Sequence, residues 1–109
     1  MTIVQIKMTQ LQKEETAHKI VIISEDPGLQ VDYSITSDEA LELAQRFMLQ
    51  GDGIVRVEAK YLGMIVEELR DRMDSAYSNW KDCGDDSEGG VYRSLVSAVK
   101  KIAAVSGRV

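Results

Sequence analysis

The 109-residue chain has one proline, one cysteine and one histidine, and each scarcity excludes a class of protein. Cys83 has no partner for an internal disulfide, which is typical of proteins in a reducing compartment. One cysteine and His18 cannot form a closed Cys/His zinc site, and neither GxxxxGK[ST] nor GxGxxG is present to bind phosphates. No apolar run approaches the roughly 20 residues that cross a bilayer, and the first residues lack the pattern of a signal peptide. We therefore expect a cytoplasmic protein without a metal or other cofactor.

The rest of the composition is that of one folded domain with an acidic exterior. Hydrophobic residues make up 44% of the chain and charged residues 28%, and 18 acidic against 13 basic residues give a formal net charge of −5. This is enough apolar side chain for one core and too much for a disordered chain. We expect residues 1–109 to form a single domain.

Patterns in the N-terminal part predict three strands. Residues 2–9 alternate apolar and polar side chains, as in a strand with one exposed face, and a polar loop is expected at 10–17. The β-branched run at 19–24 is typical of a buried strand. Pro27-Gly28 fits the centre of a type II turn, and apolar side chains alternate again over 29–35, which predicts a hairpin.

Helices are expected in the rest of the chain. Thr36 and Glu39 have the spacing of a capping box, which predicts a helix that ends at residues 51–53. Residues 54–60 alternate like a strand, but apolar residues recur at helical spacing from there to Trp80, so we favour one long helix near 54–80.

An acidic loop at 81–90 is expected to precede a final helix with an apolar stripe. The predicted fold is therefore α+β, with a three-stranded antiparallel sheet followed by three helices in the order β-β-β-α-α-α.

The segment Glu25-Asp26-Pro27-Gly28, with the strand and helix predicted after it, resembles the hairpin-to-helix core of HicB-type antitoxins. That family shares an Asp/Pro-Gly turn followed by a Glu-Ala-rich helix, which corresponds here to residues 36–44. The glycine that usually precedes the helix is missing, the residues after the helix do not match, and no helix-turn-helix is evident at the C-terminus. The resemblance is restricted to this segment and implies an antitoxin-like regulator.

Six acidic residues, with no basic residue among them, lie between positions 25 and 42: Glu25, Asp26, Asp32, Asp38, Glu39 and Glu42. Because no catalytic constellation is evident, we expect a non-enzymatic regulator or inhibitor that covers the surface of a partner protein. Phages and mobile elements encode such proteins, for example anti-CRISPR proteins and antitoxins. The six carboxylates would be the contact patch, and their field would attract a basic partner such as a nucleic-acid-binding protein.

Two alternative functions rest on other residues. A small hydrolase would use carboxylates near the predicted hairpin turn together with the only histidine, a set formed by His18, Glu25, Asp26 and Glu39. A nucleic-acid binder would use the cations of the last helix and the C-terminus, because Lys and Arg neutralise phosphates; these are Arg93, Lys100, Lys101 and Arg108.

A candidate dimer interface lies at the end of the long predicted helix. Met73, Tyr77 and Trp80 share one face there, and these residue types are enriched at protein interfaces. A helix of that length exceeds what a small domain covers, so we expect this end to meet a second copy and form a homodimer.

Overall fold

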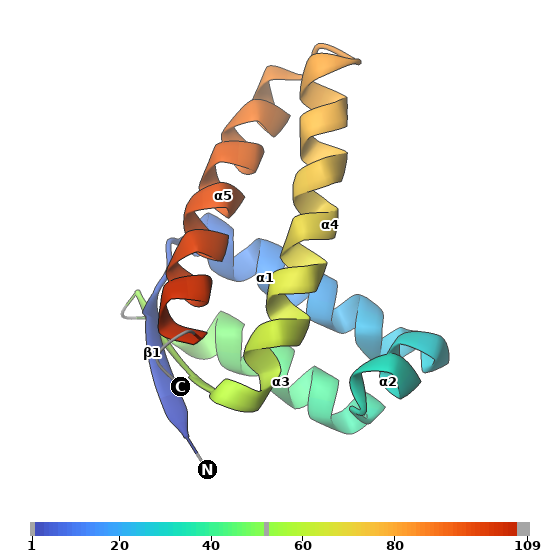
Figure 1. Ribbon diagram of the computed structural model, residues 1–109, viewed down its shortest axis with the longest axis vertical. Helices are drawn as coiled ribbons and strands as arrows, with labels where there is room; N and C mark the ends of the chain where they lie inside the picture. Colours follow the sequence, from blue (N-terminus) through green and yellow to red (C-terminus); the bar gives the residue numbers. More distant parts are fainter. Residues whose placement is uncertain (1, 52, 107–109) are drawn as a thin grey trace.

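Two strands and five α-helices make up the described residues, so the protein is α+β but its sheet is smaller than the sequence predicts. The computed structural model describes residues 2–51 and 53–106 (Figure 1). The strands are β1 (Ile3–Lys7) and β2 (Ile54–Glu58). The helices are α1 (Gln10–Glu25), α2 (Pro27–Tyr33), α3 (Ser37–Leu49), α4 (Leu62–Lys81) and α5 (Asp86–Ser106), and a short 3-10 helix, η1 (Ala59–Tyr61), precedes α4. The predicted order β-β-β-α-α-α is therefore wrong.

Helix α1 occupies the segment for which the sequence predicts a loop at 10–17 and a strand at 19–24, and both predictions are wrong. A capping box starts the helix: Thr9 Oγ1 accepts from the Gln12 backbone N–H at 3.2 Å, and Gln12 Oε1 accepts from the Thr9 N–H at 2.9 Å. The buried side of α1 contains more polar than apolar residues: Gln12, Lys13, Thr16, Ala17, Ile20, Ile23 and Ser24. Because that side is mostly polar, a search for apolar periodicity does not detect the helix.

The predicted turn at Pro27-Gly28 and the strand at 29–35 are replaced by helix α2. Asp26 Oδ1 accepts hydrogen bonds from the backbone N–H groups of Gly28 at 2.9 Å and Leu29 at 3.2 Å, and Pro27 takes the first helical position. An acidic cap followed by proline favours the start of a helix over a type II turn. Without strands at 19–24 and 29–35 there is no hairpin, so the resemblance to HicB-type antitoxins does not extend to the fold.

Helix α3 confirms its prediction. Thr36 Oγ1 accepts from the Glu39 N–H at 3.0 Å, and the Glu39 carboxylate accepts from the Thr36 N–H at 3.2 Å, which completes the expected capping box. The helix ends at Leu49, with Gln50 as its C-cap. Asp52, at the centre of the predicted terminator, lies outside the described residues.

The single helix predicted near 54–80 is wrong at its start, where β2 pairs antiparallel with β1 in a register that joins Ile3 to Glu58 and Lys7 to Ile54. Val55 and Val57 are buried between exposed or half-buried neighbours, as the alternation of this segment indicates. Pairing with β1 satisfies the backbone groups that the two strands direct toward each other, and this decides between the two patterns. Helical periodicity holds only from Leu62 onward.

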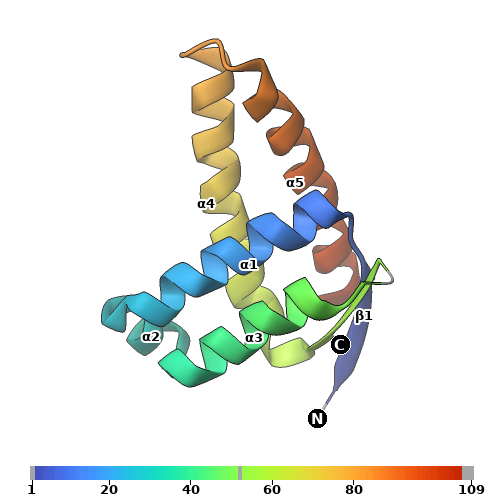
Figure 2. The same ribbon diagram turned by 180° about the vertical axis from the view of Figure 1, so that it is seen from behind.

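Helices α4 and α5 form an antiparallel hairpin that projects from the rest of the molecule (Figure 1, Figure 2). Helix α5 begins at Asp86, so part of the loop predicted at 81–90 is helical. Gly89 lets the two helices approach closely, because a Cβ atom at this position would lie 2.7 Å from the Trp80 ring. Trp80 also contacts Tyr77 and Tyr92, with ring centroids 6.3 and 6.2 Å away.

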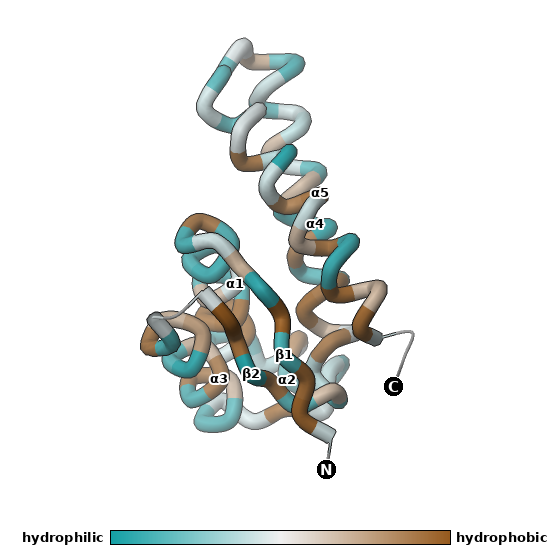
Figure 3. Tube along the Cα trace, turned by 90° about the vertical axis from the view of Figure 1, so that its left-hand side faces the viewer, coloured by the Kyte–Doolittle hydropathy of each residue, from teal (hydrophilic) through white to brown (hydrophobic). Residues whose placement is uncertain are grey.

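The base of the molecule consists of α1, α2, α3 and the sheet (Figure 2, Figure 3). Helix α1 packs along α3 and also contacts α4, while the C-terminal half of α5 lies beside β1. One buried cluster joins the inner face of the sheet to these helices and includes Ile6, Val57, Phe47, Leu69 and Ile102. This arrangement leaves β2 as the strand next to α3.

Ion pairs connect the base to the hairpin. Arg72 of α4 donates to Glu15 of α1 at 2.9 Å and to Glu88 of α5 at 2.9 Å, and all three side chains are at most 20% exposed. The hydrogen bond from Arg72 lowers the pKa of Glu88. One turn away, Lys19 of α1 bonds Asp71 at 2.8 Å and lies 3.4 Å from Glu68. Burial is the largest single influence on the Lys19 ammonium group and lowers its pKa, but the bond to Asp71 and the charges of Glu68 and Asp71 together outweigh burial and raise the pKa. The hairpin is thus held to α1 by charge as well as by apolar packing.

Candidate functional site

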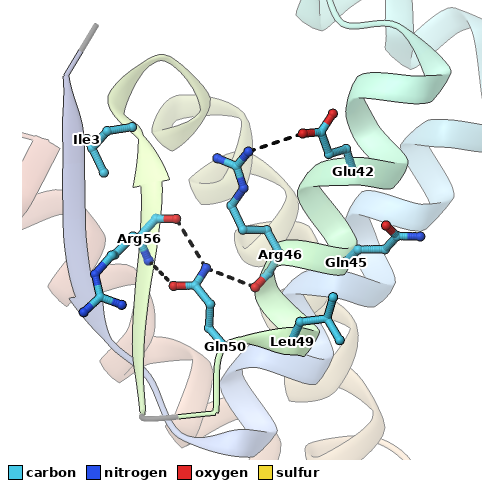
Figure 4. Close-up of a pocket in the computed structure, with 7 residues that line it drawn as sticks. All are labelled: Ile3, Glu42, Gln45, Arg46, Leu49, Gln50 and Arg56. Carbon is cyan, nitrogen blue, oxygen red and sulfur yellow. Dashed lines mark hydrogen bonds and ion pairs between the residues drawn. The ribbon is translucent and has the colours of Figure 1, made fainter.

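A groove lies between the C-terminal half of α3 and the outer edge of β2 (Figure 4). It has a volume of about 530 Å³ and is lined by residues of β1, α3, the α3 C-cap and β2: Ile3, Glu42, Gln45, Arg46, Leu49, Gln50 and Arg56. The cation on the α3 side of the groove is Arg46, which pairs with Glu42 at 3.4 Å, whereas the Arg56 guanidinium points away from α3 (Figure 4).

The Gln50 side chain bridges the groove at one end. Its Oε1 accepts from the Arg56 backbone N–H at 2.8 Å, and its Nε2 lies 3.4 Å from the Arg56 carbonyl and 3.0 Å from the Arg46 carbonyl, donating to both (Figure 4). This amide therefore bonds the outward-facing backbone groups of β2 in the way that a neighbouring strand would.

A second hollow of about 200 Å³ adjoins the groove and shares Glu42 and Arg46 with it. Tyr61 Oη donates to Glu39 Oε2 at 3.3 Å across this hollow. Glu58 Oε2 is shielded from solvent and lies 3.4 Å from Lys60 Nζ, an ion pair that does not have the geometry of a hydrogen bond. Hydrogen bonds from Thr36 lower the pKa of Glu39. The hollow thus holds a buried carboxylate oxygen that can accept a further N–H.

The adjoining side of α3, which shares Gln45 and Leu49 with the groove, presents an apolar hollow of about 530 Å³ against α1. This hollow is lined by Ala17, Val21, Leu41, Ala44, Gln45, Met48 and Leu49. Three of these side chains are unusually exposed for their type: Leu41 is 42%, Met48 46% and Leu49 81% exposed. Neither this surface nor the groove is predicted by the sequence patterns described above. A signal was present, because seven of the 13 residues of α3 are apolar, which is more than one buried stripe requires.

All six residues of the predicted acidic patch are exposed. Five of them lie at the end of the molecule where α2 joins α1 to the start of α3 (Figure 1), and Glu42 lies one turn further along α3. Asp26 and Glu39 are used as helix caps, and Glu42 pairs with Arg46 at 3.4 Å. The side chains of the other three make no hydrogen bond or ion pair with a described residue: Glu25, Asp32 and Asp38.

The carboxylates and the histidine of the hydrolase alternative do not form a hydrogen-bonded set. His18 is exposed on α1, and its imidazole makes no hydrogen bond or ion pair within residues 2–51 and 53–106. Glu25 is seven residues further along the same helix, about 10 Å away along its axis. Asp26 and Glu39 bond the backbone of their own helices. No group of three or more His, Cys, Asp or Glu residues suited to hold a metal occurs in the part of the chain that the structure describes.

The cations of the nucleic-acid alternative are partly engaged within the fold. Lys101 Nζ donates to the Lys7 carbonyl at 3.0 Å, and the Arg93 guanidinium lies 5.3 Å from the Trp80 ring centroid. Lys100 is exposed. Arg108 lies outside the described residues.

The predicted dimer residues lie on one face of α4, as expected, but two of them have contacts within the chain. Trp80 packs on Gly89, and Met73 is half-buried against the core. Tyr77 is 47% exposed, although its ring centroid lies 5.2 Å from that of Tyr92. Homodimerisation through Met73, Tyr77 and Trp80 stays a prediction, which light scattering under reducing conditions tests.

Comparison of the chain with protein-family models, with curated proteins and with solved structures gives no significant match. Among the described helices, none combines the length and the apolar character needed to span a membrane.

Proposed function

We propose that the protein acts without catalysis by binding another protein, and that the exposed face of α3 is its contact surface. The observation that carries this proposal is the apolar hollow beside Leu41, Met48 and Leu49. Contiguous exposed apolar side chains with a polar rim are typical of protein-binding surfaces. Covering them would remove apolar area from water, at about 25 cal/mol for each Å² buried.

Carboxylates border this apolar face and indicate the charge of the partner. Asp38 and Glu42 are exposed on α3 beside the apolar residues, and Glu25 and Asp32 lie beyond its N-terminal end. We propose a basic partner surface, in keeping with the regulator or inhibitor expected from the sequence. Long-range attraction of this kind raises the association rate and weakens with salt. We also propose a cytoplasmic location, where the exposed thiol of Cys83 would stay reduced.

Met48→Asp tests the proposal in a capture experiment. The immobilised chain is incubated with a lysate of its native host, and the captured proteins are quantified by mass spectrometry at low and high salt. We expect Met48→Asp to weaken capture of the main partner at least about tenfold, as at an interface hot spot. Capture by the unchanged chain should fall as salt rises.

Val31→Asp is the matched control, because Val31 is an apolar residue of α2 that is 78% exposed and lies outside the apolar hollow. It introduces the same charge and should leave capture unchanged. If both variants capture the partner as well as the unchanged chain does, the α3 face is not the contact surface. If both lose capture to the same extent, the effect is due to the added charge. If the unchanged chain enriches no protein, protein binding itself is contradicted.

A further inference from the structure

The outer edge of β2 has backbone groups directed away from β1. The N–H of Ala59 bonds the Thr2 carbonyl at 2.9 Å, and the N–H of Met8 bonds the Gly53 carbonyl at 2.8 Å. In an antiparallel pair these bonds alternate, so residues 53, 55, 57 and 59 face β1, and the N–H and C=O groups of residues 54, 56 and 58 face the groove. β2 therefore presents a strand edge toward α3.

The contacts of Gln50 show what kind of group this edge accepts. One primary amide supplies both an acceptor and a donor to Arg56, at 2.8 and 3.4 Å, which are the two bonds that a paired residue of another strand would supply. The donor bond to the Arg56 carbonyl is long at 3.4 Å, while the other N–H of the same Nε2 donates to the Arg46 carbonyl at 3.0 Å. A main-chain segment beside β2 can make both bonds to Arg56 at the usual length of about 2.9 Å.

The walls of the groove indicate the side chains of such a segment. Ile3 is 51% and Leu49 81% exposed, and they provide apolar surface. Among the described residues, the Arg46 guanidinium pairs with Glu42 alone, an exposed i,i+4 pair at 3.4 Å, and pairs of this kind contribute little. A carboxylate on the incoming segment can take the place of Glu42.

We propose that the edge of β2 binds an extended segment of a partner protein as a third strand of the sheet, with an acidic side chain on Arg46 and an apolar one between Ile3 and Leu49. The backbone of the segment replaces the Gln50 amide at Arg56. Main-chain bonds at a sheet edge supply affinity in such complexes, and pockets for alternate side chains supply specificity. The Arg46 guanidinium favours an acidic residue in the segment, in contrast to the basic surface proposed for the α3 face. The two surfaces adjoin and share Leu49, but the edge of β2 belongs only to the groove.

Phage-displayed random dodecapeptides, selected on the immobilised full-length chain, are the probe. We expect enriched sequences to alternate apolar and polar residues and to contain an acidic residue. A synthetic copy of the most enriched peptide should show nuclear Overhauser effects between its Hα atoms and those of β2. Methylating its alternate backbone nitrogens should abolish binding, since those N–H groups would bond the edge.

Two variants of the chain separate this mode of binding from other modes. Arg46→Gln should weaken the peptide about tenfold through loss of a charge-assisted bond. Gln50→Ala should strengthen binding about threefold or more, because the peptide no longer displaces an amide. Arg70→Gln, at an exposed position of α4 outside the groove, is the control and should change affinity less than about twofold.

The proposal would be overturned if no peptide is enriched. It would also be overturned if an enriched peptide keeps its affinity after both Arg46→Gln and methylation of the peptide backbone. Weaker binding by Gln50→Ala, with an unchanged melting temperature, would also overturn it, because Gln50 would then be a contact and not a substitute for the strand. Met48→Asp should leave peptide affinity unchanged, so failure of this proposal is distinguishable from failure of the α3 face.

Discussion

Replacing Gly89 by alanine should destabilise the protein, although alanine is the better helix former. The added Cβ would lie 2.7 Å from Cε2 and 2.8 Å from Cδ2 and Nε1 of Trp80. The indole cannot easily move away, because Tyr77, Tyr92 and the Lys81 ammonium, 3.9 Å from its ring centroid, surround it. The overlap must therefore be relieved by a shift of α5 relative to α4.

Two opposing effects set the magnitude. Replacing glycine by alanine inside a helix raises the free energy of unfolding by about 1 kcal/mol, because alanine is the better helix former. Overpacking a close contact destabilises by about 1–3 kcal/mol, and displacing α5 along Trp80 puts the substitution near the upper end of that range. We expect a net loss of about 1–2 kcal/mol in the free energy of unfolding, which lowers Tm by roughly 4–8 °C or more in a domain of this size.

Gly90→Ala is the matched control. It is the next residue of the same helix, and a Cβ added there meets no atom within 4 Å. It should stabilise the protein by about 0.5–1 kcal/mol. Urea unfolding followed by circular dichroism measures both changes, and Trp80 fluorescence reports on the contact itself. If Gly89→Ala stabilises the protein as much as Gly90→Ala does, the close packing of α4 and α5 at Trp80 is refuted.

Two further predictions concern α1 and the ion pairs of α4. Thr9→Ala should lower the free energy of unfolding by about 1 kcal/mol, because the N-cap of α1 is lost. Thr2→Ala is the control and should change the free energy of unfolding little, since Thr2 is exposed and precedes β1. Equal effects of the two substitutions in urea unfolding would refute the cap. Arg72→Met leaves the carboxylates of Glu15 and Glu88 without their cation and should destabilise by about 2–4 kcal/mol at pH 7. The pKa of Glu88 is below its ordinary 4.5 in the folded protein, so its contribution is present above pH 4.5 and is lost as pH falls through the lowered folded pKa. The free energies of unfolding of the unchanged chain and of Arg72→Met should therefore converge as the pH falls from 7 to 3. A difference that stays constant over this range would contradict the linkage.

The loop predicted at 10–17 and the strand predicted at 19–24 were wrong because the decisive signals for helix α1 were polar. Three polar side chains lie on the buried side of α1, and each donates to a backbone carbonyl. Gln12 donates to Ser94, Lys13 donates to Gln50, and Thr16 donates to Gln12. These bonds satisfy groups that would otherwise be costly to bury. Apolar periodicity cannot detect such a face. The capping boxes were readable in both α1 and α3, but only that of α3 preceded an apolar stripe.

The long helix predicted near 54–80 failed for a different reason, because a helical and a strand pattern overlapped at Val55 and Ala59. The choice depended on whether a partner strand was available, and β1 lies some 50 residues away in sequence. Pairing over such a separation is not encoded in any local window. For the same reason the acidic residues could be identified from the sequence, but the groove between α3 and β2 could not, because it exists only once β2 lies beside α3.

A two-stranded sheet is marginal by itself, so its stability here depends on what covers its two outer edges. On the β1 side, Lys101 of α5 donates to the Lys7 carbonyl at 3.0 Å. On the β2 side, the bonds from α3 to the edge come from one residue of its C-cap, Gln50. A helix that covers an edge protects it permanently, whereas one amide side chain can leave by rotating about its own bonds. The two edges are therefore protected in different ways, and the edge of β2 is the one that another chain can open without disturbing the core.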